Sequence, residues 1–307
     1  MSYAAVNGIR IYYEEHGSGS PLILLHGGLG MGEMYAPILP LLAKDRWVIT
    51  VDLQAHGHTA DVGRPLRFQT LADDVADLIG HLGLAQADVM GYSFGAATAL
   101  RTAIQHPDLV HRLVLVSHPC RRDGWYPESL AGMDQLGSQL AEPMKQSPMY
   151  QIYSQVAPRV QDWPVLLDKT GDLLRQDFDW SADIAKITAP VLLVYADADA
   201  VRPAHIVEFY GLLGGGLRDA NWDGSARPVA RLAILPSHTH YDIFASPDLA
   251  AAVIPFLAAP SLQPPAPPRP GPPAPPARPV SGPGASSPGM SSAGIQSSES
   301  RSDTSPA

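Results

Sequence analysis

Short apolar runs alternate with helical patterns along most of this chain, and this alternation restricts the fold more than any other feature. Strands buried on both faces are predicted by runs rich in Val, Leu and Ile at 21–25, 47–51, 87–90, 112–116, 190–195 and 231–235. Residues 70–82 between them carry one apolar stripe at helical spacing. Strands that alternate with helices predict an α/β fold with a mostly parallel sheet, which an antiparallel hairpin at 6–17 precedes.

The alternation lapses between Pro119 and Ala189, where the sequence predicts helices broken by several prolines. We expect residues 119–188 to form a helical cap inserted between two strands of a core built from residues 1–118 and 189–259. The segment is rich in Trp, Tyr and Met, and we predict that Trp125 and Trp163 line a substrate pocket. Most of its other aromatic side chains would only pack the cap onto the core.

The last segment, residues 260–307, differs in composition from the rest. It holds 14 of the 31 prolines, with Ser and Gly, and almost no large apolar side chains. Such a composition buries too little surface to offset the entropy lost on ordering, so we predict a disordered tail. A proline-rich ligand for a partner domain is the functional alternative.

Charge and cysteine content limit the partners and the compartment. The formal net charge is −9 and no basic run is present, which argues against nucleic acid or an anionic membrane as partner. The amino terminus lacks a basic segment followed by an apolar stretch, and no apolar run approaches 18 residues, so neither a signal peptide nor a transmembrane span is expected. Cys120 is the single cysteine, which suits the reducing cytoplasm. The oligomeric state is not predicted.

A serine stands between two glycines in GYSFG, residues 91–95, directly after an apolar run and before a helical pattern. A sharp turn from strand to helix forces the intervening residue into a strained conformation, which only small neighbours permit. The hydroxyl of Ser93 would then stand at the carboxyl edge of the sheet, at the amino end of a helix. This context predicts that Ser93 is a nucleophile.

A serine hydroxyl needs a base, and the base needs a carboxylate to orient it. In the chain order Ser, acid, His, the acid should follow a later strand and the histidine should lie nearer the end. Asp197 and Asp199 follow one apolar run, and His238 and His240 follow the next. The pattern alone leaves both pairs open.

From about Tyr3 to Ala258 the chain resembles an α/β-hydrolase of the bacterial esterase and lactonase-like type. The matching pieces, in the family order, are HGGLG (26–30), DLQAHGHT (52–59), GYSFG (91–95), ADADAVRP (196–203) and THYDIFASP (239–247). The resemblance implies Asp199 as the acid and His240 as the base, with Asp197 and His238 as runners-up. Many family members have Gly where this chain has Ala55, Ala96 and Ala196, but these departures remove no chemical group.

The same architecture implies an oxyanion hole made by the backbone N–H groups of Gly28 and Phe94. We expect Met34 and Tyr35, in the loop after HGGLG, to border the acyl site together with Phe94. We interpret His26 and His56 as residues that structure loops rather than transfer protons.

Other candidates for chemistry are weaker. His238 and His240, one residue apart with no supporting cluster, make a poor zinc site, so no metal or cofactor is expected. Cys120 has no evident base and is interpreted as an inert buried thiol. A structural role is preferred for His118 near the pocket. The Gly-rich stretch 211–228 lacks the order of a phosphate-binding loop and is interpreted as a lengthened connection.

These features together predict a cofactor-independent serine hydrolase that cleaves carboxylic esters of small to medium apolar substrates through an acyl-enzyme. A lactonase or an amidase would use the same triad, and a carbon–carbon bond hydrolase of the same fold is a further alternative. Dehalogenases and epoxide hydrolases are disfavoured because both normally place Asp where Ser93 stands. A non-catalytic binding protein on this fold would be expected to have lost a member of the triad, and none is missing.

Overall fold

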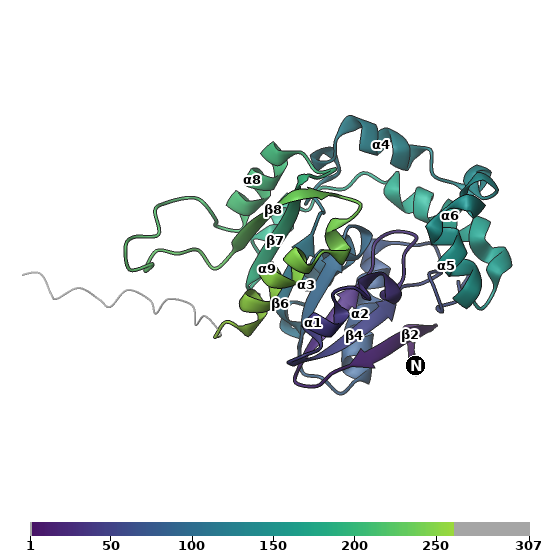
Figure 1. The fold of residues 1–307 in the computed structure, drawn as a ribbon, viewed down its shortest axis with the longest axis horizontal. Coiled ribbons are helices and arrows are strands. Elements are labelled where there is room, and N and C mark those ends of the chain that lie inside the picture. Colours follow the sequence, from purple (N-terminus) through teal and green to yellow (C-terminus); the bar gives the residue numbers. More distant parts are fainter. Residues whose placement is uncertain (1, 261–307) are drawn as a thin grey trace, which may run out of the picture. The chain divides into compact units, whose positions relative to one another are not determined.

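The computed structural model describes residues 2–260, which build one mostly parallel sheet with helices on both faces (Figure 1). The eight strands follow the order β1-β2-β4-β3-β5-β6-β7-β8, and only the β1–β2 and β2–β4 pairs are antiparallel. Their bounds are β1 Ser2–Val6, β2 Ile9–His16, β3 Ser20–Leu25, β4 Arg46–Asp52, β5 Ala87–Tyr92, β6 Val110–Val116, β7 Val191–Ala198 and β8 Arg231–Thr239. This is the α/β-hydrolase fold that the sequence predicts.

Helices cover the sheet in two layers. The α-helices are α1 Leu39–Leu42, α2 Phe68–His81, α3 Phe94–Gln105, α4 Pro127–Asp134, α5 Pro148–Val156, α6 Trp163–Leu174, α7 Ser181–Ile184, α8 Pro203–Leu212 and α9 Pro247–Ala258. The 3-10 turns are η1 Gly32–Tyr35, η2 Pro107–Leu109, η3 Arg122–Gly124, η4 Ser138–Leu140, η5 Pro143–Gln146, η6 Val160–Asp162 and η7 Ile243–Ala245. Side chains of α2, α3 and α8 pack on one face, and those of α1 and α9 pack on the other.

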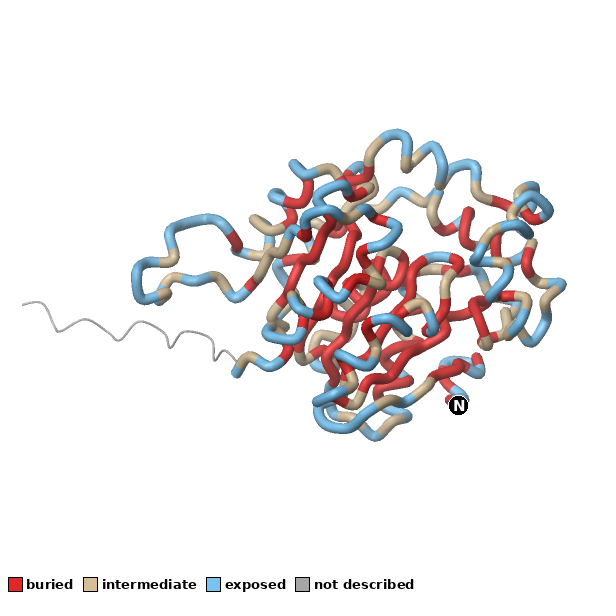
Figure 2. Tube along the Cα trace, viewed as in Figure 1, coloured by how far each residue is buried: buried red, intermediate tan, exposed pale blue. Residues whose placement is uncertain are grey.

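Alternation along the strands assigns each side chain to one of these two layers. In β3, Ile23 and Leu25 join the core under α2 and α3, whereas Leu22 and Leu24 join the core under α1 and α9. Because both faces are covered, β5 is buried along its whole length and its neighbours over most of theirs, as the red tube in Figure 2 shows.

The last strand departs from the sequence prediction. The run at 231–235 was expected to be buried on both faces, but β8 is the edge of the sheet and Ile234 is 46% exposed. Its apolar composition resembles that of the central strands, and composition does not distinguish an edge strand that α9 covers on one face only. The hairpin at the other edge agrees with the sequence, because Asn7 and Gly8 turn between β1 and β2 with φ of 42° and 76°.

Helices α4 to α7 lie in the chain between β6 and β7, within the segment 119–188. Three of the prolines expected to break these helices begin them, whereas Pro158 lies between α5 and η6. Pro127, Pro148 and Pro164 occupy the first turns of α4, α5 and α6, where the missing N–H has no partner in any case.

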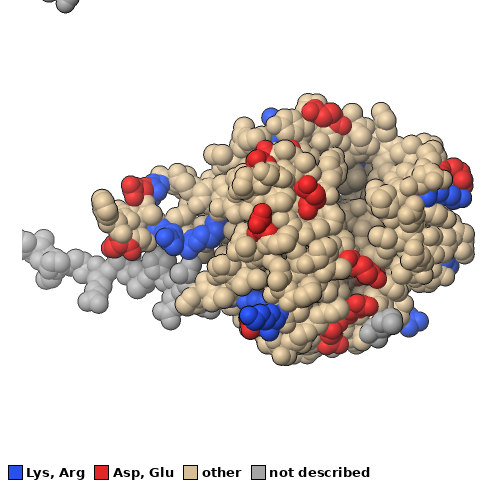
Figure 3. Space-filling model, in the orientation of Figure 1, with Lys and Arg blue, Asp and Glu red and all other residues tan. Residues whose placement is uncertain are grey.

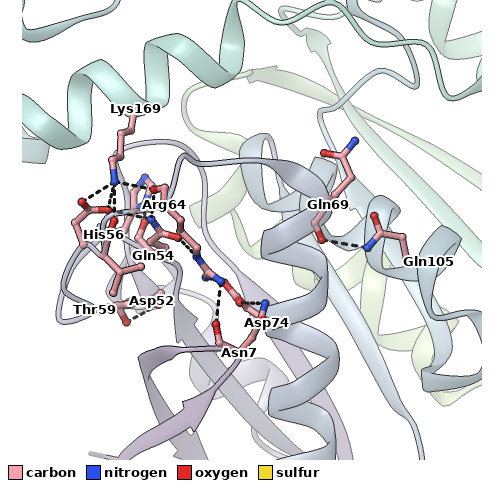
Figure 4. Close-up of polar contacts among 12 residues, drawn as sticks. Asn7, Asp52, Gln54, His56, Thr59, Arg64, Gln69, Asp74, Gln105 and Lys169 are labelled. Carbon is pink, nitrogen blue, oxygen red and sulfur yellow. Dashed lines mark hydrogen bonds and ion pairs between the residues drawn. The ribbon is translucent and has the colours of Figure 1, made fainter.

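A partly buried cation attaches this segment to the core (Figure 4). Lys169 of α6 points into the loop that follows β4, where its ammonium donates to both oxygens of Asp61 and to the carbonyls of Val62 and Arg64. The Arg64 side chain in turn donates to Gln54. These contacts hold α6 over the carboxyl ends of the strands.

The predicted tail, residues 260–307, lies outside the described residues except for Pro260. Among the described residues, no helix is both long enough and apolar enough to cross a membrane. On the face drawn in Figure 3, Lys and Arg occur as small separate groups among Asp and Glu.

Candidate active site

The turn from β5 into α3 presents Ser93. Its φ of 51° and ψ of −113° are strained for a residue with a side chain. Two glycines make the turn possible, because a Cβ on Gly91 would lie 2.1 Å from the carbonyl oxygen of Gly95, and one on Gly95 would lie 2.2 Å from that of Leu25. The spacing of GYSFG is therefore a packing requirement of the turn.

Ser93, His240 and Asp199 form one hydrogen-bonded chain. The Ser93 Oγ lies 3.1 Å from His240 Nε2, and His240 Nδ1 lies 3.0 Å from Asp199 Oδ1. Asp199 follows β7 and His240 follows β8, so neighbouring parallel strands deliver both groups to the carboxyl edge where Ser93 stands. The structure brings together the serine that the local context predicted and the acid and base that the resemblance implied.

Asp199 is buried and fully occupied by hydrogen bonds. Its Oδ2 accepts from the Ser117 hydroxyl and from the N–H of Ala196, and its Oδ1 also accepts from the N–H of Val201. Burial favours the neutral acid, but the hydrogen bond and charge of His240, with the donors just named, outweigh it and lower the pKa of Asp199 below its ordinary 3.8. The carboxylate therefore stays ionised beside the imidazole.

Ser117 is a site residue that sequence reasoning missed. It directly follows β6, and its N–H donates to the carbonyl of Val194 in β7, which places its hydroxyl beside Asp199. The available signal was its position, since a polar residue directly after a central strand lies at the same sheet edge as the nucleophile.

The runners-up lie away from Ser93. The Asp197 side chain is exposed and accepts from the N–H of His238. The His238 Nε2 lies 3.0 Å from the Ser246 hydroxyl and 3.2 Å from an oxygen of Asp248. Neither side chain contacts the nucleophile.

The two predicted oxyanion donors lie next to each other. A Cβ added to Gly28 would lie 3.7 Å from the Cβ of Phe94. Within residues 2–260, no hydrogen bond takes the N–H of either residue, so both donors are free to receive a ligand oxygen. Phe94 also begins α3, whose amino end favours negative charge.

Two buried histidines shape the loops around these donors. His26 Nε2 accepts the N–H of Leu53, and its Nδ1 donates to the carbonyl of Gly27, which ties the loop after β3 to the loop after β4. The His56 Nδ1 donates to the carbonyl of Gln54. Burial lowers the pKa of His56 to about 3, so its ring is neutral. Neither histidine contacts Ser93.

The predicted pocket residues divide into two groups. Trp125 lies edge-on to His240 with ring centroids 5.5 Å apart, and the half-buried Met34 accepts the N–H of Gly27 beside the oxyanion loop. The predictions for Tyr35 and Trp163 are wrong. Tyr35 is fully buried under α1 and α9, where its hydroxyl donates to the carbonyl of Leu25. Trp163 is 1% exposed and packs α6 on Tyr153.

Cys120 and one possible metal-binding group have structural explanations. Cys120 is buried, and burial raises the pKa of its thiol to about 11, which keeps it protonated. Among the described residues, one group could hold a metal ion, formed by Glu33, Asp52 and His58. The Asp52 oxygens accept the N–H groups of Gly32 and His58 and face the His58 ring, so this group joins two loops.

Comparison with known proteins places the chain in a family. A family described as "alpha/beta hydrolase fold" matches residues 20–145. The chain belongs to the α/β-hydrolase superfamily. Because Ser93 is hydrogen-bonded to His240, the protein is a serine hydrolase of this fold.

Individual relatives match it at different lengths. A soluble epoxide hydrolase from Corynebacterium sp. is 35% identical over 37% of the chain, but this match spans only 40% of that protein. A pimeloyl-acyl-carrier-protein methyl ester esterase from Aliivibrio salmonicida is 27% identical over 64% of the chain and 80% of its own length. The solved structure of an enol-lactonase from Burkholderia xenovorans LB400 superposes with a TM-score of 0.63 at 23% identity, covering 84% of this chain and all of that one.

Proposed function

We propose that this protein hydrolyses carboxylic esters of small to medium apolar substrates through an acyl-enzyme intermediate. The observation that carries the proposal is the hydrogen-bonded chain from Ser93 through His240 to Asp199. His240 Nε2 removes the proton from Ser93 Oγ as the oxygen attacks the ester carbonyl, and the Asp199 carboxylate stabilises the imidazolium that forms.

The tetrahedral intermediate carries its negative charge on the former carbonyl oxygen. The N–H groups of Gly28 and Phe94 receive this oxygen, and the amino end of α3 adds its dipole. Each such donor is worth about 2.7–4 kcal/mol of transition-state stabilisation. His240 then protonates the departing alcohol, and afterwards it activates the water that releases the acid.

The serine nucleophile and the activities named for the relatives together favour an ester as the substrate. The Aliivibrio relative, which matches over most of its length, is named as a methyl ester esterase. The Corynebacterium relative is named as an epoxide hydrolase, but Ser93 stands where such enzymes normally have an aspartate. A lactone is a cyclic ester that needs no further group, and the enol-lactonase structure makes lactones the second substrate class to test.

The decisive experiment is a substrate panel with matched variants. We expect wild-type protein to hydrolyse aryl and methyl esters with kcat/KM well above its values for lactones, amides and vinylogous diketones. Ser93→Ala, Asp199→Asn and His240→Ala should each remove nearly all turnover, while Asp197→Asn and His238→Ala should retain most of it. Faster turnover of diketones than of esters would instead assign the chain to carbon–carbon bond hydrolysis.

A covalent probe checks the nucleophile independently of the substrate. A fluorophosphonate should add once to Ser93, as located by peptide mass spectrometry, and Ser93→Ala should not be labelled. Labelling at another residue would contradict the assignment.

The single cysteine and the acidic charge support a cytoplasmic enzyme that acts on small molecules, with neither nucleic acid nor membrane as partner.

A further inference from the structure

His118 is a buried imidazole that nothing in the fold accounts for. It follows Ser117 at the end of β6 and is 3% exposed. Neither of its ring nitrogens has a hydrogen-bond partner among the described residues. Leaving a buried polar group unpaired costs about 1–3 kcal/mol, so a histidine at this position lowers the stability of the fold.

The surroundings of His118 are aromatic. Phe178 lies almost parallel to its ring, with centroids 5.7 Å apart and an interplanar angle of 11°. Three further rings lie at centroid distances of 5.4 to 6.3 Å from His118, namely Trp125, Phe68 and Trp180. Together with Phe178 they form what we call the aromatic wall. A phenylalanine would suit such a wall better, so the polar atoms of His118 require a reason outside the packing.

This aromatic wall reaches the reacting groups from two sides. Trp125 contacts both His118 and His240, and Phe68 contacts both His118 and Phe94, whose N–H is one of the oxyanion donors. The unpaired imidazole is therefore separated from the catalytic histidine by a single ring. Phe178 is only half-buried, as Ser93 is.

We propose that His118 recognises the substrate, with its ring forming a hydrogen bond to a neutral polar group, such as the hydroxyl of a hydroxylated aromatic ring, on an ester held within the aromatic wall. This inference rests on the proposed ester hydrolysis. A flat ring fits between aromatic side chains, and the imidazole supplies one donor and one acceptor.

The charge state of His118 agrees with a neutral partner. Burial, followed by the charges of His240 and His205, lowers its pKa to about 3, so the ring carries no charge at neutral pH. A neutral imidazole offers no charge to pair with a substrate carboxylate, but it binds a hydroxyl as donor or acceptor.

Matched substrate pairs test the hydrogen bond. The pairs are 4-hydroxyphenyl acetate with 4-methylphenyl acetate, and methyl 4-hydroxybenzoate with methyl 4-methylbenzoate, which place the polar group on either side of the ester. We expect the ratio of kcat/KM, hydroxyl over methyl, to fall by about tenfold from wild type to His118→Phe in at least one pair, as the loss of one hydrogen bond predicts. Comparing ratios removes the intrinsic reactivity of each ester.

Phe178→Leu is the matched control. It removes an aromatic contact without a polar atom, so it should lower both members of a pair alike and leave their ratio unchanged. If wild type and His118→Phe give the same ratio in both pairs, as they would if an internal water satisfied the imidazole, the inference is overturned.

A binding measurement separates this inference from the proposed function. Calorimetry of wild-type protein with the unreactive ketones 4-hydroxyacetophenone and 4-methylacetophenone should give a lower Kd for the hydroxyl compound, and His118→Phe should lose the difference. This result would support recognition by His118 even if no ester were hydrolysed. Hydrolysis of all four esters, with hydroxyl-to-methyl ratios of kcat/KM and of Kd that His118→Phe leaves unchanged, would uphold the function and refute the inference.

Discussion

Replacing His118 with phenylalanine should make the folded protein less sensitive to acid. The pKa of His118 is lowered by burial from its ordinary 6.5 to about 3, so the folded state binds fewer protons than the unfolded state between these two pH values. The free energy of unfolding therefore falls as the pH is lowered from 6.5 towards 3. Phenylalanine cannot titrate, and its ring matches the aromatic neighbours.

The magnitude follows from the two pKa values. Between pH 7.5 and pH 5, a group with a pKa of 6.5 when unfolded and about 3 when folded lowers the free energy of unfolding by about 2 kcal/mol. His56, whose pKa is also lowered to about 3 by burial, contributes a similar loss. The buried His26 and His205, whose pKa values are also lowered by burial, add to the wild-type loss. Only the share of His118 disappears in His118→Phe, so this variant should lose about 2 kcal/mol less than wild-type protein.

Urea unfolding followed by tryptophan fluorescence at pH 7.5 and pH 5 measures both differences. A change in packing caused by the new ring is the same at both pH values and cancels in the comparison. The control is Val207→Ala, at an exposed position of α8, which removes no titratable group and should leave the wild-type difference unaltered. An unchanged pH difference in His118→Phe would show that His118 is hydrated or charged in the folded protein, and the reasoning would fail.

Three other changes test the support of the site. Ser117→Ala removes a donor from Asp199 and should lower kcat about tenfold with little change in KM. Equal kcat in wild type and variant would deny Ser117 a positioning role. Lys169→Met leaves Asp61 without its cation and should lower the Tm by roughly 4–8 °C. The control Lys186→Met, at an exposed position, should leave the Tm unchanged. Equal Tm values for the two variants would show that the contacts of Lys169 do not stabilise the fold. Across aryl esters whose acyl chains have about two to sixteen carbons, kcat/KM should rise a little under fourfold for each added methylene up to butyrate or hexanoate and should then fall sharply. A maximum at palmitate would indicate an open groove.

The sheet and the position of the Ser93 nucleophile were predictable because each is encoded locally. Runs of Val, Leu and Ile bounded by polar residues mark buried strands, and parallel strands place their carboxyl ends at one edge. The choice of Asp199 over Asp197 depended on the family resemblance. Regular strand alternation would place both side chains on one face, but β7 has a register irregularity between Ala196 and Ala198 and ends there, so that Asp197 is exposed and Asp199 is buried.

The pocket was not predictable to the same degree, because it depends on contacts between distant segments. Trp125 and Trp163 are both tryptophans of the segment 119–188, yet one meets His240 and the other meets Tyr153. Tyr35 follows the oxyanion loop by only a few residues, but η1 turns its side chain into the core under α1 and α9. Aromatic composition identifies neither arrangement.

The ends of β5 and β6 show why local sequence alone leaves roles undecided. Each strand is followed by a serine with a positive φ, 51° at Ser93 and 56° at Ser117. Gly91 and Gly95 let α3 begin directly after Ser93, so that its hydroxyl faces His240 and an incoming substrate. Ser117 has β7 beside it, so its hydroxyl faces Asp199 instead. A serine with positive φ thus supplies the nucleophile after one strand and the support of the acid after the next, and the surrounding elements determine which role each serine has.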